Sequence, residues 1–222
     1  MTAPFLLRRS KSQVLSDLPE KDEKTIYSGM EDEQRKLYLA AHKQLVDQLQ
    51  GIDSAYYEKN KIFILSQLTK LRQICCHPAL CYDDYQGSSA KLEACMELVQ
   101  RAVKGKHKVL LFSQFTSMLD LIRERLAEQN TKYYCLTGNT DKQERQRLVD
   151  EFQNDDTPVF LISLKAGGTG LNLTAADIVI HYDPWWNVAA QNQATDRAHR
   201  IGQKKHSNGV PFDRKRNSLE EG

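Results

Sequence analysis

Val109-Leu110-Leu111-Phe112 is the stretch of sequence that decides the fold. Its residues are apolar without the alternation of a half-exposed strand, which indicates a strand that is buried on both faces. Further short apolar segments follow at Tyr133–Leu136, Val159–Ile162 and Ile178–Ile180. Helical patterns of about ten residues separate the first three segments, and strands that alternate with such helices predict parallel βαβ units. The sequence therefore predicts an α/β fold, with a parallel sheet that is flanked by helices.

Capping residues predict where two of the helices begin. Ser117 is predicted to cap the helix that follows the first strand. Thr140 and Gln143 have the spacing of a capping box, for a helix that ends near Phe152.

Residues 1–105 have a different pattern, which is helical and highly charged. After a polar connector at Asp17–Lys24, apolar residues recur at helical spacing over Met30–Gln50. Pro78 ends a second helical segment, and Lys91–Val103 is another amphipathic helix. A three-residue rhythm in the second segment predicts one buried face, made of Ile62, Leu65, Leu68, Leu71 and Ile74.

The charge balance of the 222-residue chain is nearly even, with 31 basic and 29 acidic residues and a net charge of +2. A domain that binds nucleic acid through its bulk charge is strongly basic, so only a local basic patch remains possible here. The longest apolar runs are short, whereas a membrane span needs ~20 apolar residues. The first residues also lack the apolar core of a signal peptide. We therefore expect a cytoplasmic protein without a membrane segment.

The cysteines are 5 in number and unevenly spaced, which indicates reduced intracellular thiols rather than a disulfide framework. Cys75, Cys76, His77 and Cys81 allow a zinc interpretation, but the paired Cys-x-x-Cys spacing is missing and no second ligand pair follows. The alternative is a set of small buried side chains at a helix end before Pro78. We predict no metal site.

One glycine-rich loop, Ser163–Leu173, follows a predicted strand at its carboxyl end, where α/β folds build their sites. The sequence contains no Gly-x-x-x-x-Gly-Lys-Ser/Thr, which nucleotide-hydrolysing α/β domains place after a strand. It also lacks the Asp-Glu pair at a strand end that would hold magnesium. The glycines either let backbone N–H groups approach a phosphate or form a tight turn that needs positive φ. Glycine content alone does not decide between these two interpretations.

A second polar segment, Gln193–Gln203, is predicted to lie on a helix that starts near Val188. Arg197 and Arg200 share a face of this helix, so the two guanidinium groups can grip one polyphosphate. A solvated helix face is the alternative, and the arginine pair alone favours it. Both tryptophans of the chain, Trp185 and Trp186, stand nearby at a strand end. One is expected to be buried, and an exposed one could stack on a base or insert into a groove.

These segments occur together in the order and spacing of the second motor lobe of the Swi/Snf-type family, the DNA-translocating ATPases of helicase superfamily two. The resemblance covers about residues 3–206, and the closing Arg-Ala-His-Arg-Ile-Gly-Gln is highly specific to the family. The Trp-Trp-Asn and Ala-Gly-Gly-Thr-Gly-Leu-Asn forms resemble the bacterial branch. The segments that carry the resemblance are Pro4–Arg9, Leu15–Lys21, Leu71–Pro78, Lys108–Thr116, Leu136–Gly138, Ser163–Leu173, Asp183–Asn187 and Gln193–Gln203.

The resemblance implies two RecA-like lobes that hold ATP and Mg²⁺ between them, so that only the complete two-lobe enzyme uses these ligands. In the family the first lobe carries the phosphate loop, the magnesium-binding acids and the base. This chain resembles the second lobe alone, which would bind no cofactor and hydrolyse no ATP by itself. By resemblance Arg197 and Arg200 are the catalytic arginine fingers. The implied ATP-cleft residues are Gly168, Gly170, Gln193 and Asp196, and Gln193 would support the fingers.

The resemblance also implies a track for one DNA strand along the strand ends. N–H and hydroxyl groups there would meet phosphates, which holds the register without reading the base sequence. Trp186 matches the family tryptophan that contacts DNA. The implied DNA-binding residues are Ser113, Gln114, Thr137, Gly138, Ser163, Lys165, Ala166, Gly167 and Trp186.

Four segments follow from the resemblance: an inter-lobe linker at 1–25, a helical protrusion at 26–90, a C-terminal RecA-like helicase lobe at 91–206 and a tail at 207–222. After Gln203 the family normally continues with an apolar strand and a helix. His206–Gly222 shows no such strand. We therefore expect a truncated lobe that is followed by foreign or disordered residues.

The sequence thus predicts the second motor lobe of a bacterial, nucleoid-associated ATPase that moves along double-stranded DNA and remodels protein–DNA complexes. Its partners would be double-stranded DNA, the N-terminal lobe of the same protein and a remodelled protein target. Two alternatives stay open: a degenerate helicase-like lobe that acts as an interaction scaffold, and a Rossmann-like enzyme that uses Ser163–Gly170 for a cofactor phosphate. A Gly-x-x-x-x-Gly-Lys-Thr loop in the upstream coding region would favour the motor.

Overall fold

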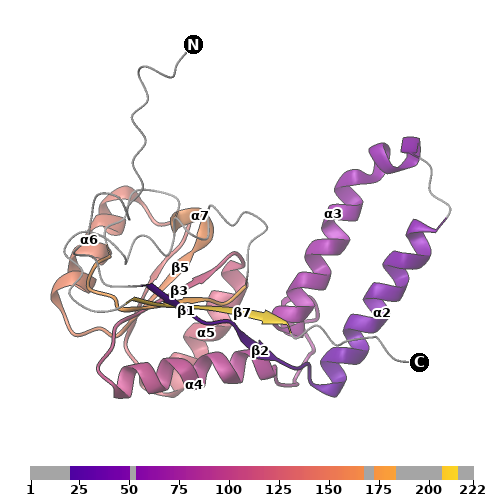
Figure 1. Ribbon diagram of the computed structural model, residues 1–222. Helices are drawn as coiled ribbons and strands as arrows, with labels where there is room; N and C mark the ends of the chain where they lie inside the picture. Colours follow the sequence, from indigo (N-terminus) through magenta and orange to yellow (C-terminus); the bar gives the residue numbers. More distant parts are fainter. Residues whose placement is uncertain (1–20, 51–53, 168–172, 184–206, 215–222) are drawn as a thin grey trace, which may run out of the picture.

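A parallel sheet forms the centre of the computed structural model, which describes residues 21–50, 54–167, 173–183 and 207–214 (Figure 1). Four of its strands are β3 (Val109–Ser113), β4 (Tyr133–Leu136), β5 (Val159–Ser163) and β6 (Ile178–His181). β3 pairs with β5 on one side and with β6 on the other, and β4 pairs with β5. All three pairings are parallel, so the predicted α/β fold with a parallel sheet is confirmed.

Both faces of this sheet are covered, as the apolar strands require. In Figure 1, α4 (Ala90–Lys104) and α5 (Thr116–Glu128) lie below the sheet, and α6 (Lys142–Asn154) and α7 (Leu164–Gly167) lie above it. Alternate residues of β3 enter two separate cores. Val109 and Leu111 pack with α4 and α5, while Leu110 and Phe112 pack with α6. The unbroken apolar run therefore reflects a strand with no solvent-exposed face.

Replacing Phe160 in β5 by alanine is expected to lower the free energy of unfolding by about 3–5 kcal/mol, because the cavity left behind cannot fully collapse. The Phe160 ring is fully buried, and its centroid lies 5.1 Å from that of Phe152 and 6.0 Å from that of Tyr134. Chemical denaturation of this chain measures the change. Phe63→Ala is the control, since that ring is 45% exposed. Equal losses in the two variants would contradict the assignment of Phe160 to the core.

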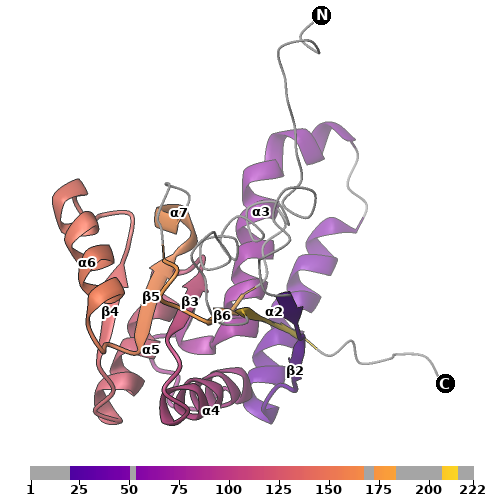
Figure 2. The ribbon, with the colours of Figure 1, turned by 60° about the vertical axis from the view of Figure 1, so that its left-hand side comes forward.

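Two long helices stand beside the sheet, α2 (Asp32–Leu49) and α3 (Ser54–Cys76), and they pack against each other (Figure 2). The predicted buried face of α3 is correct only near the sheet, where Leu71 and Ile74 are buried. Ile62 and Leu65 are 86% and 56% exposed, so the prediction is wrong for the first half of the helix. The physical reason is that this half projects beyond the sheet, as Figure 2 shows.

Both predicted caps are wrong by one or two positions. α5 begins after Phe115 with no side-chain cap, and the hydroxyl of Ser117 has no capping role. Asp141 caps α6, where its carboxylate accepts the N–H groups of Gln143 at 2.8 Å and Glu144 at 2.9 Å. A carboxylate is favoured at this end because it also meets the positive end of the helix dipole. Thr140 instead accepts the N–H of Thr137 at 3.1 Å, which closes the turn after β4.

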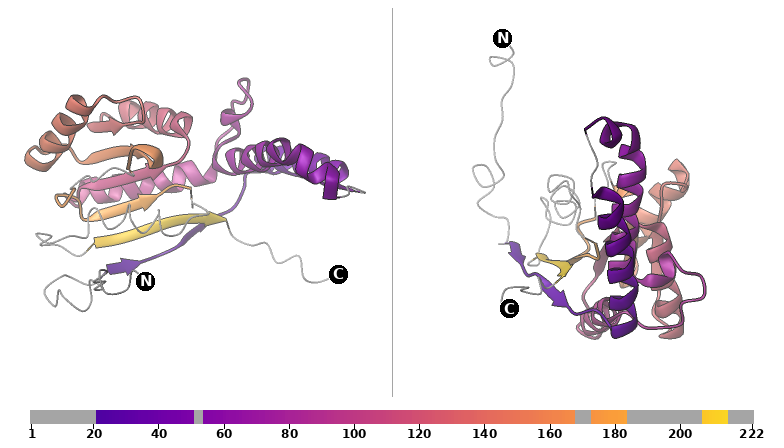
Figure 3. Two further views of the ribbon diagram at one scale, coloured as in Figure 1. Left: turned by 90° about the horizontal axis from the view of Figure 1, so that it is seen from above. Right: turned by 90° about the vertical axis from the view of Figure 1, so that its right-hand side faces the viewer.

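The sheet continues beyond β6 in a part of the chain where the sequence predicts no strand. β7 (Ser207–Arg214) runs parallel to β6, and β1 (Lys21–Glu23) and β2 (Ile26–Ser28) run parallel to β7 (Figure 3). The predictions of a strandless tail and of a polar connector over Lys21–Glu23 are therefore corrected. Strand pairing uses backbone N–H and C=O groups, so the open edge of β6 accepts a segment that lacks an apolar run.

The end of α3 lies where the sequence predicts it, with α3 ending at Cys76 and a short 3-10 turn (Pro78–Leu80) following. The five cysteines are free thiols, and Cys76 and Cys95 are buried. Among the residues that the structure describes, no group of three His, Cys, Asp or Glu side chains is arranged to hold a metal ion. Within the same residues, no helix combines the length and the hydropathy that a bilayer crossing requires.

Candidate nucleic-acid interface

The carboxyl ends of four parallel strands meet at one edge of the sheet, and most of the predicted DNA-binding residues that the structure describes lie there. Ser113 and Ser163 are the last residues of neighbouring strands and pair in register. Thr137 follows β4, which is the next strand beyond β5. Asp183 comes two residues after β6, on the other side of β3. The parallel topology thus brings together residues from three separate segments that the sequence predicts to bind DNA.

The segment after β5 is held by its own hydrogen bonds and by α6. The Ala166 N–H donates to the hydroxyl of Ser163 at 3.3 Å. The guanidinium of Arg145 donates to the Ala166 carbonyl at 3.2 Å. Lys165, which directly precedes Ala166, stays exposed. A methyl group on Gly138 would lie 4.0 Å from Lys165 Cδ, so the turn after β4 and the segment after β5 are neighbours.

The segment after β3 is organised by a buried carboxylate, that of Asp183, which is not among the predicted site residues. Asp183 is 2% exposed and accepts the backbone N–H of Gln114 with both oxygens, at 3.2 and 3.1 Å. Burial raises the pKa of the Asp183 carboxyl, while hydrogen bonds from the Ser113 hydroxyl and the Gln114 N–H oppose the rise, as do the charges of Lys91 and Arg72. An acidic residue directly after an apolar strand is the sequence signal that marks this position.

Hydrogen bonds within the chain already engage several N–H groups at this edge. The N–H of Gln114 donates to Asp183, and that of Phe115 donates to the Ser113 hydroxyl at 3.1 Å. The N–H groups of Thr137 and Ala166 are engaged as described above. A bound phosphate would therefore depend on side-chain donors rather than on these N–H groups. The two that stand out are the ammonium of Lys165 and the amide of Gln114.

The side-chain amide of Gln114 is hydrogen-bonded through its oxygen but not through its nitrogen. Its Oε1 accepts a hydrogen bond from Arg72 Nη1 at 2.9 Å. Its Nε2 is buried and has no hydrogen-bond partner among the described residues. A buried donor without an acceptor costs about 1–3 kcal/mol, so this atom is suited to an oxygen that arrives from elsewhere.

The remaining predicted site residues lie outside the described residues: Gly168, Gly170, Trp186, Gln193, Asp196, Arg197 and Arg200. Gly167 is the last residue of α7. The described residues thus hold one part of the candidate site, the edge next to β3, β4 and β5. They do not include the predicted arginine fingers or the predicted ATP-cleft residues.

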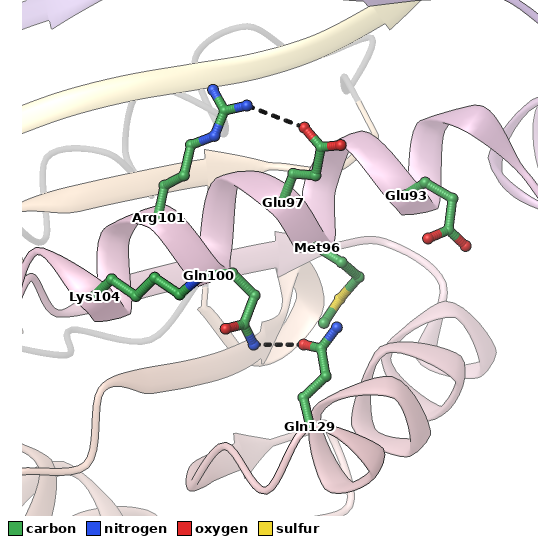
Figure 4. Close-up of a pocket in the computed structure, with 7 residues that line it drawn as sticks. All are labelled: Glu93, Met96, Glu97, Gln100, Arg101, Lys104 and Gln129. Atoms are coloured by element: carbon green, nitrogen blue, oxygen red, sulfur yellow. Dashed lines mark hydrogen bonds and ion pairs between the residues drawn. The ribbon is translucent and has the colours of Figure 1, made fainter.

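A shallow pocket of about 230 Å³ lies on another part of the surface (Figure 4). It is formed by α4 and the end of α5, and its side chains are mostly polar or charged. Because α5 begins at the carboxyl edge of the sheet and Gln129 follows its last residue, this pocket lies toward the opposite edge. Gln100 donates to Gln129 at 2.6 Å across it. It is separate from the candidate interface.

Comparison with known proteins agrees with this architecture. Residues 90–202 match the family described as helicase conserved C-terminal domain, and residues 1–80 match the SNF2-related domain. The putative ATP-dependent helicase/translocase YwqA of Bacillus subtilis is 44% identical over 211 residues, which are 91% of this chain and 22% of that protein. The ISWI chromatin-remodeling complex ATPase ISW1 of Saccharomyces cerevisiae is 36% identical over 215 residues, 91% of this chain and 19% of that protein.

Solved structures extend the match to three dimensions. The SWI2/SNF2 ATPase core of Sulfolobus solfataricus in complex with dsDNA has a TM-score of 0.76 and 36% identity, and the match covers 96% of this chain and 45% of that chain. The C-terminal domain of the Sulfolobus solfataricus SWI2/SNF2 ATPase has a TM-score of 0.72 and 33% identity, with 87% and 79% covered.

The fold and these matches define a RecA-like helicase lobe. The chain belongs to the Swi2/Snf2 family of helicase-like ATPases, and it corresponds to the C-terminal lobe of that family. It spans about a fifth of the length of the curated relatives that it matches. Bacterial relatives at 41–44% identity stand beside eukaryotic ones at 35–38%, in agreement with the predicted bacterial resemblance.

Proposed function

We propose that this chain is the second motor lobe of an ATP-dependent translocase that moves along double-stranded DNA. The observation that carries the proposal is the convergence of Ser113, Gln114, Thr137, Gly138 and Lys165 at one edge of a sheet. The chain superimposes with a TM-score of 0.76 on a SWI2/SNF2 core that was solved with dsDNA. Phosphate contacts at such an edge would hold the strand in register and would read no base sequence.

The proposal assigns ATP and Mg²⁺ to the complete enzyme. Arg197 and Arg200 would stabilise the charge on the transferring phosphoryl group, with Gln193 as their support, while Gly168, Gly170 and Asp196 would line the cleft. All of these residues lie outside the described part of the chain. The N-terminal lobe of the same protein would supply the phosphate loop, and nucleotide hydrolysis would open and close the two lobes. A protein bound to the DNA would be the target that the motor remodels, and the DNA track would keep the enzyme at the bacterial nucleoid.

Gln114→Glu in the two-lobe enzyme tests the DNA contact. The carboxylate keeps the size of the side chain and can still accept from Arg72, but it replaces the Nε2 donor with an oxygen that repels phosphate. Loss of a hydrogen bond to a charged group is worth ~1.5–3 kcal/mol, so we expect the affinity for duplex DNA to fall about 10–100-fold. Titration of fluorescent duplex at several salt concentrations measures the affinity and its salt dependence.

Gln100→Glu is the matched control, because it makes the same chemical change in the pocket toward the opposite edge of the sheet. Its DNA affinity should equal that of the unmodified enzyme. Unchanged DNA binding in Gln114→Glu would contradict the proposed track. The interaction-scaffold alternative predicts that outcome, since a scaffold needs no phosphate contact at this edge.

A further inference from the structure

We propose that Arg72 is a positioning residue for DNA binding, which acts by fixing the orientation of the Gln114 side chain. Arg72 belongs to α3 of the helical protrusion, whereas Gln114 follows β3 in the lobe. The inference rests on the proposed DNA contact of Gln114 and adds to it a role for the protrusion. The protrusion would then contribute to the site that binds the DNA strand.

The contact between the two side chains fixes which end of the amide is free. Arg72 Nη1 donates to Gln114 Oε1 at 2.9 Å. An arginine can only donate, so the oxygen of the amide must face α3 and the NH₂ group must face away from it. The Arg72 guanidinium carbon also lies 5.9 Å from the centroid of the Phe115 ring, which restrains the arginine in turn. The Nε2 donor, which has no hydrogen-bond partner among the described residues, is therefore kept in one orientation.

The main chain of Gln114 is fixed independently. Its N–H donates to the buried carboxylate of Asp183, and the next N–H, that of Phe115, donates to Ser113. The residue is thus restrained twice, at its backbone by Asp183 after β6 and at its side-chain amide by Arg72 of α3. A donor that is already oriented loses less conformational entropy when a phosphate oxygen arrives.

The end of α3 is itself anchored to the lobe, so that Arg72 has a defined position. The Cys76 carbonyl accepts from the hydroxyls of Tyr182 at 2.9 Å and Ser89 at 3.0 Å. Gln34 Nε2 of α2 donates to the Ile74 carbonyl at 2.8 Å. These side chains satisfy carbonyls that the last turn of a helix leaves without a partner. Arg72 lies one turn before this anchored end.

A double-mutant cycle in the two-lobe enzyme tests the proposal, with Arg72→Met, Gln114→Ala and the double variant. Methionine keeps an unbranched apolar stem beside Phe115 and removes the donor and the charge. Lys70→Met is the matched control, because it removes one positive charge from the same helix two residues away. The measured quantities are the DNA concentration for half-maximal ATPase stimulation and the maximal rate, with thermal melting as the check on folding.

We expect Gln114→Ala to raise the half-maximal DNA concentration about 10-fold or more through loss of the phosphate contact. Arg72→Met should raise it about 3–10-fold, since the freed amide must be ordered by the DNA itself. The double variant should match Gln114→Ala within about twofold, because Arg72 acts through that residue. Lys70→Met should leave both the half-maximal DNA concentration and the maximal rate unchanged.

Three outcomes would overturn the proposal in distinguishable ways. If the two single effects multiply in the double variant, Arg72 contacts DNA by itself. If Gln114→Ala weakens binding while Arg72→Met does not, the amide needs no positioning and the DNA track stands without it. If Gln114→Ala leaves DNA binding unchanged, the proposed contact of Gln114 is wrong as well. Should Arg72→Met melt early, Arg72→Lys replaces it in the cycle, since lysine keeps the charge but loses the planar donor group.

Discussion

Arg200→Ala in the two-lobe enzyme is expected to lower DNA-stimulated ATP hydrolysis about 10³–10⁵-fold. The expectation comes from the sequence, because Arg200 lies outside the described residues. An arginine supplied across a cleft stabilises the charge that spreads over the transferring phosphoryl group, and alanine leaves that charge unmatched. We expect the variant to fold normally, because apolar side chains of described residues fill the two cores of the sheet.

Steady-state ATPase measurements with saturating duplex DNA give the rate, and circular dichroism and thermal melting check the fold. Arg101→Ala is the control, because the Arg101 side chain is 78% exposed on α4 and forms an ion pair with Glu97 of the same helix. It should keep normal turnover. Near-normal turnover in Arg200→Ala would rule out its assignment as an arginine finger. A fall in turnover with a lower melting temperature would indicate a structural role instead.

The isolated 222-residue chain is expected to hydrolyse no ATP above background. Its sequence contains no Gly-x-x-x-x-Gly-Lys-Ser/Thr loop, and the proposal places that loop on the N-terminal lobe. A single lobe would offer a nucleotide only half of its binding surface. The measurement is a phosphate-release assay with Mg²⁺, with and without duplex DNA, on protein whose fold has been verified by circular dichroism.

The two-lobe enzyme is the positive control in the same assay. Robust magnesium-dependent hydrolysis by the purified chain would refute the assignment as half of a motor. Tight nucleotide binding without hydrolysis would favour the Rossmann-like alternative, in which Ser163–Gly170 holds a cofactor phosphate. Equilibrium dialysis with ATP and with NAD distinguishes these outcomes.

The sheet is the part of the fold that could be predicted from the sequence. The Val109–Phe112 run specifies a strand covered on both sides, and both cores are built on it. Burial on one or two faces leaves a local periodicity in the chain, so it can be recognised without knowing the partner. The carboxyl ends of parallel strands share one edge, so the gathering of Ser113, Thr137 and Ser163 also follows from the sequence.

Features that depend on which distant segment packs or pairs with an element could not be predicted in the same way. The rhythm of α3 identifies a helical face, but Ile62 stays exposed because that part of the helix projects beyond the sheet. β7 forms because β6 has an open edge, which the composition of Ser207–Arg214 does not reveal. Asp141 caps α6 instead of Thr140 because the choice depends on where the first turn begins.

For the candidate site, the sequence by itself determined the strands, the residues at their ends and the family. Only the tertiary structure decided which groups at that edge remain available for a ligand. Asp183 accepts the backbone N–H of Gln114, which lies 69 positions away. Arg72 donates to the side-chain amide of the same residue from 42 positions away. Hydrophobic periodicity is local and can be recognised from neighbouring residues. A hydrogen bond between distant segments forms only when the chain folds.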